Sequence, residues 1–156
     1  MKIWEATEID LTQMIDIWWE MQSSHDNYDP KYYQTRSENE CRGLARKYFK
    51  EFLLDKNHLF LVAGVSEKIV GMIHLQILIK PPVYRAQRYA LIQDVVVTQS
   101  YQNRGIFKAL LDHAKDRLRL ENINLMELLV DENNPAVKAY GQVGFTTRQR
   151  LMIKWF

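Results

Sequence analysis

A polar, basic turn with one glycine joins an apolar run to a stretch that reads as a helix, and its residue types suit the binding of an anion. The first N–H groups of a helix have no partner within it, and the helix dipole is positive there, so phosphate groups bind at such ends. Gly105 has no Cβ and lets a ligand approach the backbone, while Arg104 and Lys108 add positive charge. One glycine is a weak signal, and a plain helix start with solvated cations explains the turn equally simply.

Two known phosphate-binding motifs are excluded. The P-loop requires G-x-x-x-x-G-K-[ST], which this sequence lacks, and the dinucleotide fingerprint requires G-x-G-x-x-G, whereas the turn has the single Gly105. A phosphate-bearing ligand would therefore have to bind this turn in another way.

An acidic residue interrupts the β-branched run that precedes the turn. In a strand over 89–97, side chains alternate between faces, which places Ile92, Asp94 and Val96 on one face. Asp94 then has two interpretations. Either it lies at an edge in solvent, or it is a base that meets a reacting group directly or through water.

The elements that position these residues follow from apolar periodicity, caps and turn residues. A capping box of Ser37 and Glu40 opens one helix, and Asn134 with Pro135 opens a short one that ends at Gly144. The other expected helices are 11–22 and 104–120, the expected loop is 80–87, and the expected strands are 2–7, 58–65, 68–79, 89–97, 123–130, 145–150 and 151–156. This order predicts a mixed α/β (α+β) domain around one central sheet.

Composition fits a single domain over residues 1–156. Apolar residues make up 47% of the chain and the net charge is +2, which argues against nucleic acid as a partner and against a basic membrane tail. One cysteine, Cys41, excludes an internal disulfide and fits a reducing compartment. No signal segment is visible, and no apolar run approaches the roughly 20 residues of a membrane span, so we expect a cytoplasmic protein with no membrane partner.

Two motifs in this chain resemble those of the Gcn5-related N-acetyltransferase (GNAT) superfamily. The first, [QR]-x-x-G-x-[GA] after an apolar strand end, is matched from Gln102 to Gly105, with Phe107 in the last place and the triplet 95–97 upstream. Gln99 stands where the family often has Pro. The second, N-x-x-A-x-x-x-Y-x-x-x-G-F, is matched by Asn133, Ala136, Tyr140, Gly144 and Phe145. The resemblance covers almost the whole chain and is sharpest over 90–145.

The resemblance implies the GNAT fold, a central mixed sheet of about six to seven strands with helices on both faces, and an acyl-coenzyme A donor, here acetyl-CoA. In the family, pantetheine pairs with the fourth strand, here Val95 and Val97. The pyrophosphate lies on N–H groups of the turn. The residues that the resemblance assigns to the turn are Gln102, Asn103, Arg104, Gly105, Phe107 and Lys108. Asn133 lies where the family contacts the coenzyme, and Tyr140 where it often places a general acid for the departing thiolate.

Simpler interpretations remain open for several of these residues. Tyr140 is also typical of a core tyrosine on an amphipathic helix, and Asn133 of a plain turn. Phe107 starts a helical stripe that continues through Leu111, Ala114 and Leu118, so we expect its ring in the core and its N–H still at the turn.

The catalytic base is not fixed by the resemblance. Some polyamine and amino-sugar acetyltransferases have Glu-Asp where this chain has Gln93 and Asp94. Because Gln93 cannot take a proton, Asp94 or a water relay would serve as the base.

The first two helices and the loop between them are expected to shape the acceptor pocket. Acids among aromatics suit a cationic amine. The residues in question are Trp18, Trp19, Glu20, His25, Asp26, Tyr28, Asp29, Tyr32 and Tyr33, each of which is also explained singly by packing or solvation. No cluster has metal-ligand spacing, so no metal is expected.

These observations lead to one main interpretation and two alternatives. We expect an N-acetyltransferase that transfers an acetyl group from acetyl-CoA to a small cationic amine by direct attack, with Tyr140 as acid and Asp94 as base. The alternatives are an enzyme acting on a protein N-terminus or lysine, and a non-catalytic acyl-CoA-binding domain. Many relatives dimerise, so the resemblance leaves a homodimer open.

Overall fold

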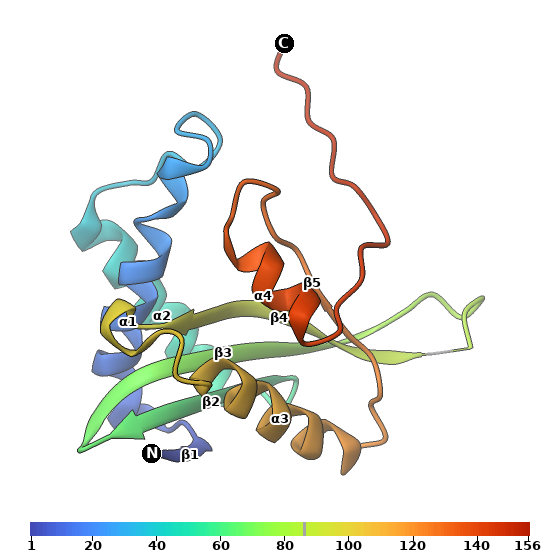
Figure 1. Ribbon diagram of the computed structural model, residues 1–156, viewed down its shortest axis with the longest axis horizontal. Coiled ribbons are helices and arrows are strands. Elements are labelled where there is room, and N and C mark those ends of the chain that lie inside the picture. The colour runs from blue at the N-terminus through green and yellow to red at the C-terminus, as the bar shows by residue number, and fades with distance from the viewer. Residues whose placement is uncertain (86) are drawn as a thin grey trace.

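The computed structural model describes residues 1–85 and 87–156, and it contains one mixed sheet with helices on both faces (Figure 1). The strands are β1 (Lys2–Glu5), β2 (His58–Val65), β3 (Lys68–Ile79), β4 (Arg88–Val97) and β5 (Met126–Leu128). The helices are α1 (Leu11–Gln22), α2 (Glu38–Leu53), α3 (Ile106–Arg119) and α4 (Ala136–Gln142), with short 3-10 turns η1 (Glu8–Asp10), η2 (His25–Asn27) and η3 (Gln99–Tyr101). The expected loop over 80–87 includes Ala86, which lies outside the described residues.

The sheet has the strand order β1-β2-β3-β4-β5. Its first three ladders are antiparallel, and the last, between β4 and β5, is parallel. The mixed α/β fold predicted from the element order is therefore confirmed.

Two apolar clusters sandwich the sheet. One lies under α3, and the other lies under α1 and α2. Successive side chains of β2 point alternately into the two clusters. Leu61 and Ala63 belong to the cluster under α3, and Phe60 and Val62 belong to the other. Each fully buried aliphatic side chain contributes about 1.5–3 kcal/mol, so these two layers hold the sheet in place.

The helix ends follow the predicted caps. Ser37 Oγ accepts the N–H of Glu40, and the Glu40 carboxylate accepts the N–H of Ser37, so the capping box forms as expected. Asn134 Oδ1 accepts the N–H of Ala136 at the start of α4, and Gly144 follows that helix with a φ of 95°. No helix of the described residues is both long enough and apolar enough to cross a bilayer.

A β-bulge in β4 changes which side chains share a face. The register against β3 shifts by one residue between the pairs made by Ile92 and Asp94, so Gln93 is an extra residue in β4. Ile92 consequently lies in the cluster under α3, while Val96 lies in the cluster under α1 and α2. The prediction that Ile92, Asp94 and Val96 share one face is therefore wrong for Ile92, because a bulge interrupts the period of two.

The sheet has fewer strands than the six to seven expected. The strand expected over 123–130 is confined to Met126–Leu128, and the segments 145–150 and 151–156, expected as strands, pair with no strand in the described part of the chain. Their composition suits a strand, but a strand also needs a neighbouring edge for its backbone hydrogen bonds.

Candidate active site

The edge of β4 that faces β5 is unpaired where β4 approaches the turn. The parallel ladder to β5 ends at Ile92. Thr98 N–H donates to a carbonyl of β3 (2.9 Å), so the alternation of the strand directs the N–H and C=O groups of Val95 and Val97 to the opposite edge. Within the described residues no strand pairs with that edge beyond Ile92. The result is an open hydrogen-bonding edge between β4 and β5.

The turn that follows β4 offers free N–H groups at the N-terminus of α3. Among residues 1–85 and 87–156, no oxygen accepts a hydrogen bond from the N–H groups of residues 103–108. Asn103 and Gly105 have φ angles of 59° and 77°, which curl the turn. A Cβ at Gly105 would meet no atom within 4 Å, so the space over this glycine is open. The turn thus has the geometry of an anion site and requires Gly105 for its backbone conformation as well.

The side chains of the turn are partly engaged with the protein. Gln102 Nε2 donates to the carbonyl of Val97 (3.0 Å), which satisfies one group of the open edge. The guanidinium of Arg104 lies 5.1 Å from the centre of the Tyr101 ring. Lys108 forms an ion pair with Asp112 one helical turn further on (2.6 Å). The backbone N–H groups therefore provide the free donors, and the cations add charge beside them.

Tyr140 lies on α4, next to side chains that pack against the cluster under α3. Its ring packs edge to face against Phe107 of α3, with ring centres 5.6 Å apart, and against Phe145. Burial, with a smaller effect of the nearby Tyr28, raises the pKa of Tyr140 to about 12. The hydroxyl thus keeps its proton at neutral pH. Phe107 is half-buried against the cluster under α3, as the helical stripe predicts, and it also supports the Tyr140 ring.

Asp94 lies at the end of a chain of two histidines that sequence reasoning missed. His74 Nδ1 lies 3.0 Å from Asp94 Oδ2, and His74 Nε2 lies 2.8 Å from His58 Nδ1. His74 is 2% exposed and stacks on Phe60, with ring centres 3.9 Å apart. His58 reaches toward Asp55 at the surface, 4.0 Å away. The two histidines stand on different strands, so no local spacing in the sequence links them to Asp94.

The hydrogen-bond directions in this chain follow from what each group can donate or accept. A carboxylate oxygen accepts, so His74 Nδ1–H donates to Asp94, which leaves His74 Nε2 to accept from His58 Nδ1–H. Burial, together with the neighbouring His74, lowers the pKa of His58 and keeps it neutral. The chain therefore fixes one oxygen of Asp94 and leaves the other free to accept a proton.

Aromatic side chains from the segment after α1 gather next to these groups. His25 stacks on Tyr33 (5.4 Å between ring centres), and Tyr28 and Tyr32 pack edge to face against Tyr33. The Tyr33 hydroxyl donates to Asp131, which follows β5 (3.1 Å). These contacts bring the predicted acceptor segment against the ends of β4 and β5.

The pKa of His25 is set by burial and by nearby polar groups. Burial is the main cause that lowers the pKa of His25, whereas a backbone hydrogen bond with Gln22 and the carboxylates of Asp94 and Asp131 act in the opposite direction. Nδ1 of His25 is buried and has no hydrogen-bond partner within the described residues. Asp94, His25 and Asp131 thus border one region, which Tyr28 connects to Tyr140.

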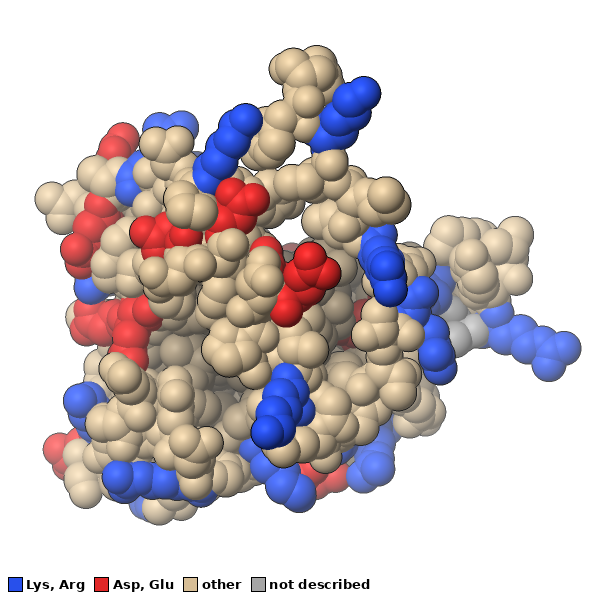
Figure 2. Space-filling model, turned by 45° about the horizontal axis from the view of Figure 1, so that its top comes forward, with Lys and Arg blue, Asp and Glu red and all other residues tan. Residues whose placement is uncertain are grey.

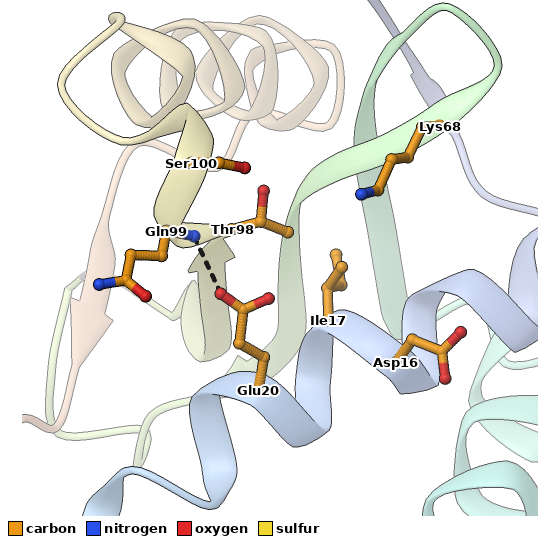
Figure 3. A pocket seen from close by; sticks show the side chains of 7 residues that line it. All are labelled: Asp16, Ile17, Glu20, Lys68, Thr98, Gln99 and Ser100. Carbon is orange, nitrogen blue, oxygen red and sulfur yellow. Dashed lines mark hydrogen bonds between the residues drawn. The ribbon is translucent and has the colours of Figure 1, made fainter.

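Other residues expected near the acceptor lie elsewhere. Trp18 packs edge to face on Phe49 and belongs to the apolar layer under α1 and α2. Glu20 accepts the N–H of Gln99 (2.9 Å), in an open hollow of about 610 Å³ between α1 and the end of β4 (Figure 3). That hollow borders neither Gly105 nor Tyr140.

A second hollow, of about 320 Å³, lies beside the aromatic segment. It is lined by Trp19, Gln22, Ser23, Asp26, Pro30, Tyr33, Gln34 and Thr35. Figure 2 shows Asp and Glu side chains on the left and in the centre of the molecule, with Lys and Arg side chains among them. The lining of this second hollow includes the aromatic side chains of Trp19 and Tyr33 and one acid, Asp26.

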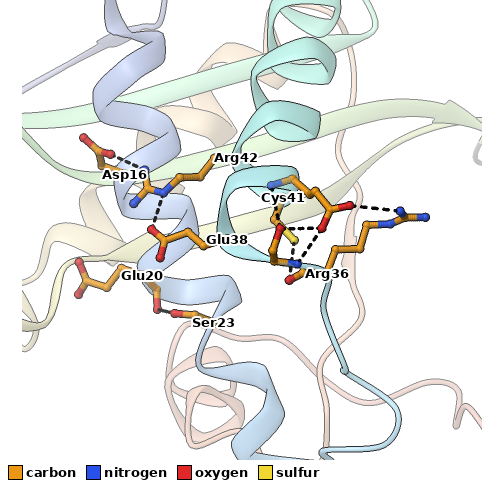
Figure 4. Close-up of polar contacts among 9 residues, drawn as sticks. Asp16, Glu20, Ser23, Arg36, Glu38, Cys41 and Arg42 are labelled. Carbon is orange, nitrogen blue, oxygen red and sulfur yellow. Dashed lines mark hydrogen bonds and ion pairs between the residues drawn. The ribbon is translucent and has the colours of Figure 1, made fainter.

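One ion pair joins α1 and α2, the two helices that flank this segment. Arg42 pairs with Asp16 of α1 (2.6 Å) and with Glu38 of its own helix (2.7 Å), as Figure 4 shows. These hydrogen bonds raise the pKa of Arg42, so it stays charged. The helices that flank the aromatic segment are therefore fastened to each other next to it.

Asn133 is exposed in the turn between β5 and α4. Its N–H donates to Asp131 Oδ1 (2.8 Å), which is typical of a turn residue. Its role as a coenzyme contact stays a prediction. Within residues 1–85 and 87–156, no three His, Cys, Asp or Glu side chains lie close enough to hold a metal ion.

The chain belongs to the acetyltransferase (GNAT) family, whose sequence model matches residues 11–145. This family is the one that the two sequence motifs resemble, and membership makes the chain an N-acetyltransferase enzyme.

Solved structures share the fold over the whole chain. A mutant of the BH1408 protein from Bacillus halodurans superposes with a TM-score of 0.89 at 19% identity, covering 100% of this chain and 99% of that one. A transcriptional regulator from Bacillus halodurans C-125 has a TM-score of 0.78 at 28% identity, covering 99% of each chain. A predicted acetyltransferase from Clostridium acetobutylicum, solved with acetyl-CoA, has a TM-score of 0.78 at 15% identity, covering 98% of this chain and 94% of that one.

Proposed function

We propose that this enzyme transfers an acetyl group from acetyl-CoA to the primary amine of a small cationic molecule. The observation that carries the proposal is the open edge of β4, which runs directly into a turn with free N–H groups at the start of α3. An extended amide-bearing chain that ends in a pyrophosphate matches both parts, and a structural relative was solved with acetyl-CoA.

The donor would be held mainly by the backbone. Val95 and Val97 would bind the amide groups of pantetheine, and the N–H groups of residues 103–108 would bind the pyrophosphate. Arg104 and Lys108 supply positive charge beside it. When bound, acetyl-CoA supplies an activated thioester carbonyl.

Asp94 and Tyr140 would move the protons. Asp94 accepts a proton from the attacking amine at the oxygen that His74 leaves free. Tyr140, which keeps its proton at neutral pH, donates toward the sulfur as negative charge develops there. The free N–H groups of β4 would stabilise the charge on the carbonyl oxygen. No side chain needs to form a covalent bond to the acetyl group.

The acceptor would be a cation because its site is aromatic and acidic. Tyr28, Tyr33 and His25 present ring faces and edges, and Asp94 and Asp131 lie close to His25. An ammonium group is attracted by aromatic faces and by carboxylates. The ammonium would lose one proton to solvent before it attacks, and Asp94 would accept the second proton as the new C–N bond forms.

Thermal unfolding with acetyl-CoA tests the donor part first. A ligand at about 100 times its dissociation constant adds roughly 2.7 kcal/mol to the free energy of unfolding. We expect a clear rise in melting temperature with acetyl-CoA. The absence of any rise at millimolar ligand would contradict the proposal.

A turnover assay then tests the acceptor part. Release of free thiol from acetyl-CoA is followed with polyamines, amino sugars, a lysine-containing peptide and a peptide with a free N-terminus. We expect turnover with small cationic amines. Turnover with peptides alone would identify a protein-modifying enzyme, and donor binding without turnover on any amine would leave a binding domain.

A further inference from the structure

The bulge in β4 places two consecutive polar side chains, Gln93 and Asp94, on one face of the sheet. Asp94 contacts His74 of β3 (3.0 Å), and Gln93 Nε2 donates to Gln76 Oε1 of the same strand (2.7 Å). His74 and Gln76 are two residues apart in β3, so their side chains point to the same face. A strand without the bulge would turn Gln93 and Asp94 to opposite faces. The proposed base therefore stands next to a pair of side-chain amides.

This amide pair has hydrogen-bonding capacity that the protein leaves unused. Gln93 is exposed and Gln76 is half-buried, and within the described residues neither side chain makes another hydrogen bond. A side-chain amide carries two N–H donors and an oxygen that accepts twice, so one bond between two amides leaves both free donors and free acceptors. This remains true whichever amide donates to the other. The pair can therefore bind a ligand group that donates and accepts at once.

The charges around the amide pair do not favour a second ammonium group there. Leu91 lies opposite Gln76, and Glu127 of β5 lies opposite Leu91. The carboxylate of Glu127 is already engaged in an ion pair with Lys80. The hydrogen bond to Glu127 raises the pKa of Lys80, so Lys80 stays charged. An ammonium group only donates and a carboxylate only accepts, whereas a hydroxyl does both, so a hydroxyl matches the amide pair best.

We propose that Gln76 and Gln93 bind a hydroxyl group on the carbon atom next to the reacting amine, so that the acceptor is an amino alcohol with a single ammonium group. The inference rests on the proposed function and narrows its substrate class. Because Gln93 and Asp94 are consecutive residues on one face, groups on neighbouring carbon atoms of one small molecule can reach both. Asp94 receives the amine proton while the amides hold the hydroxyl, which fixes the acceptor at two points. Polyamines are then poorer acceptors, since their next amine finds no free carboxylate at the amide pair.

Matched acceptors provide the first test. trans-2-Aminocyclohexanol carries a hydroxyl next to its amine, trans-1,2-diaminocyclohexane carries a second amine there, and cyclohexylamine carries neither. The ratio of kcat/KM for the amino alcohol to kcat/KM for cyclohexylamine is compared between the parent enzyme and its variants, because differences in amine basicity cancel in that comparison. We expect the ratio to fall about 3- to 10-fold in Gln76→Leu and in Gln93→Leu, the size of one neutral hydrogen bond. An unchanged ratio in both variants would overturn the inference.

Two further variants show whether the effect comes from this pair of amides. Gln93→Glu supplies a carboxylate at the same place, and we expect it to raise kcat/KM for the diamine relative to the amino alcohol. Gln142→Leu removes an exposed amide at the end of α4 and should leave the ratios of the parent enzyme in place. A ratio that falls equally in Gln142→Leu would show that the hydroxyl is not bound by the pair, and would count against the inference.

Binding to the enzyme saturated with coenzyme A tests the same pair without turnover. Titration calorimetry gives the Kd of each ring amine. We expect Gln93→Leu to raise the Kd of the amino alcohol about 3- to 10-fold more than that of cyclohexylamine. This result without turnover on any amine would support the amide pair and contradict acetyl transfer. Turnover with equal effects of Gln93→Leu on the two Kd values would overturn the amide pair and leave acetyl transfer standing, and failure of all three amines to bind would contradict both.

Discussion

Asp94 differs from an ordinary strand carboxylate because a buried imidazole fixes one of its oxygens. The hydrogen bond from His74 holds the carboxylate in one orientation, and His58 fixes the tautomer of His74. A base held in this way has one free oxygen with a defined direction. This arrangement is the main reason for assigning the proton-accepting role to Asp94 rather than to a water molecule alone.

Replacement of Asp94 tests this role directly. Asp94→Asn retains an oxygen that accepts from His74, so the fold should be preserved while the base is lost. We expect kcat for the amine acceptor to fall by about 10²–10⁴-fold. The control Asp116→Asn removes an equal charge from an exposed pair with Arg119 and should leave kcat unchanged. Full activity of Asp94→Asn across the pH range would show that the base lies elsewhere.

The hydroxyl of Tyr140 can be removed without changing the packing of its ring. Tyr140→Phe keeps the packing against Phe107 and Phe145 but removes the proton donor. We expect kcat to fall by about 10²-fold with little change in the KM for acetyl-CoA. Tyr28→Phe, which removes a hydroxyl from the neighbouring cluster, is the matched control for donor binding. Because the pKa of Tyr140 is about 12, its ionisation should cause no loss of activity below pH 10. Equal kcat for Tyr140→Phe and the parent enzyme would reduce Tyr140 to a packing residue.

At the scale of elements, the bulge at Gln93 explains both what the sequence predicts well and what it misses. The strand, the turn and the helix after it follow from composition and spacing. The bulge is invisible in the apolar pattern, because Ile92 and Val96 are both buried whichever face they occupy. It moves Asp94 to the face of His74 and directs Val95 and Val97 to the open edge.

The turn at the start of α3 should tolerate no side chain at Gly105. Its φ of 77° is costly for any residue with a Cβ, so Gly105→Ala should lower the free energy of unfolding by about 1–2 kcal/mol. The new methyl group would also stand in the open space above the turn and weaken acetyl-CoA binding. Gly43→Ala in α2 is the control, because no atom lies within 4 Å of the added Cβ and the helix favours alanine. Thermal unfolding with and without acetyl-CoA measures both effects, and an undiminished ligand shift in Gly105→Ala would contradict a donor at this turn.

Phe107 should matter for packing more than for donor binding. Phe107→Gly removes a half-buried ring and places glycine in a helix, so we expect the free energy of unfolding to fall by roughly 1–3 kcal/mol. Acetyl-CoA affinity should stay within about tenfold, since the N–H of residue 107 remains at the turn. Phe107→Leu is the conservative control and should recover most of the stability. A large gain in acetyl-CoA affinity with unchanged stability would mean that the ring blocks the site.

At the scale of the whole molecule, the helix caps and the apolar stripe of α3 are predicted correctly, and the errors in the sheet concern strand pairing. The stripe of α3 and the capping box at Ser37 depend on neighbours three or four residues away, which a sequence displays. The contact between His58 and His74 depends on the register of the hairpin formed by β2 and β3. Whether residues 145–156 find a strand partner depends on which edges of the whole sheet are open. Strand propensity alone could not show which edge is available to the last segment.

The pH dependence of stability should reveal the buried histidines. Burial lowers the pKa of His58 and of His25 in the folded protein. At pH values below the ordinary histidine pKa of about 6.5, the unfolded chain therefore binds protons that the folded chain does not bind. Stability should be complete above that pH and decline as the pH falls toward the lowered pKa values, by at most about 1.4 kcal/mol per pH unit for each group.

Chemical denaturation at pH 5 to 8 measures this slope. His58→Asn keeps a donor near the position of Nδ1 without a titrating ring and should flatten the decline. His113→Asn changes a histidine on the other side of the sheet, in α3, and is the control. An identical slope in the parent protein and in His58→Asn would mean that His58 is not held neutral by the fold.

The histidine chain also bears on how the strands find their alignment. β3 is buried on both faces over most of its length, so its apolar pattern alone accepts more than one register against β4. A slip by one residue would turn His74 toward the apolar layer under α3 and leave Asp94 without its donor. A buried polar group without a partner costs about 1–3 kcal/mol, which penalises the slipped pairing. The atoms proposed to orient the base therefore also select a single strand alignment during folding.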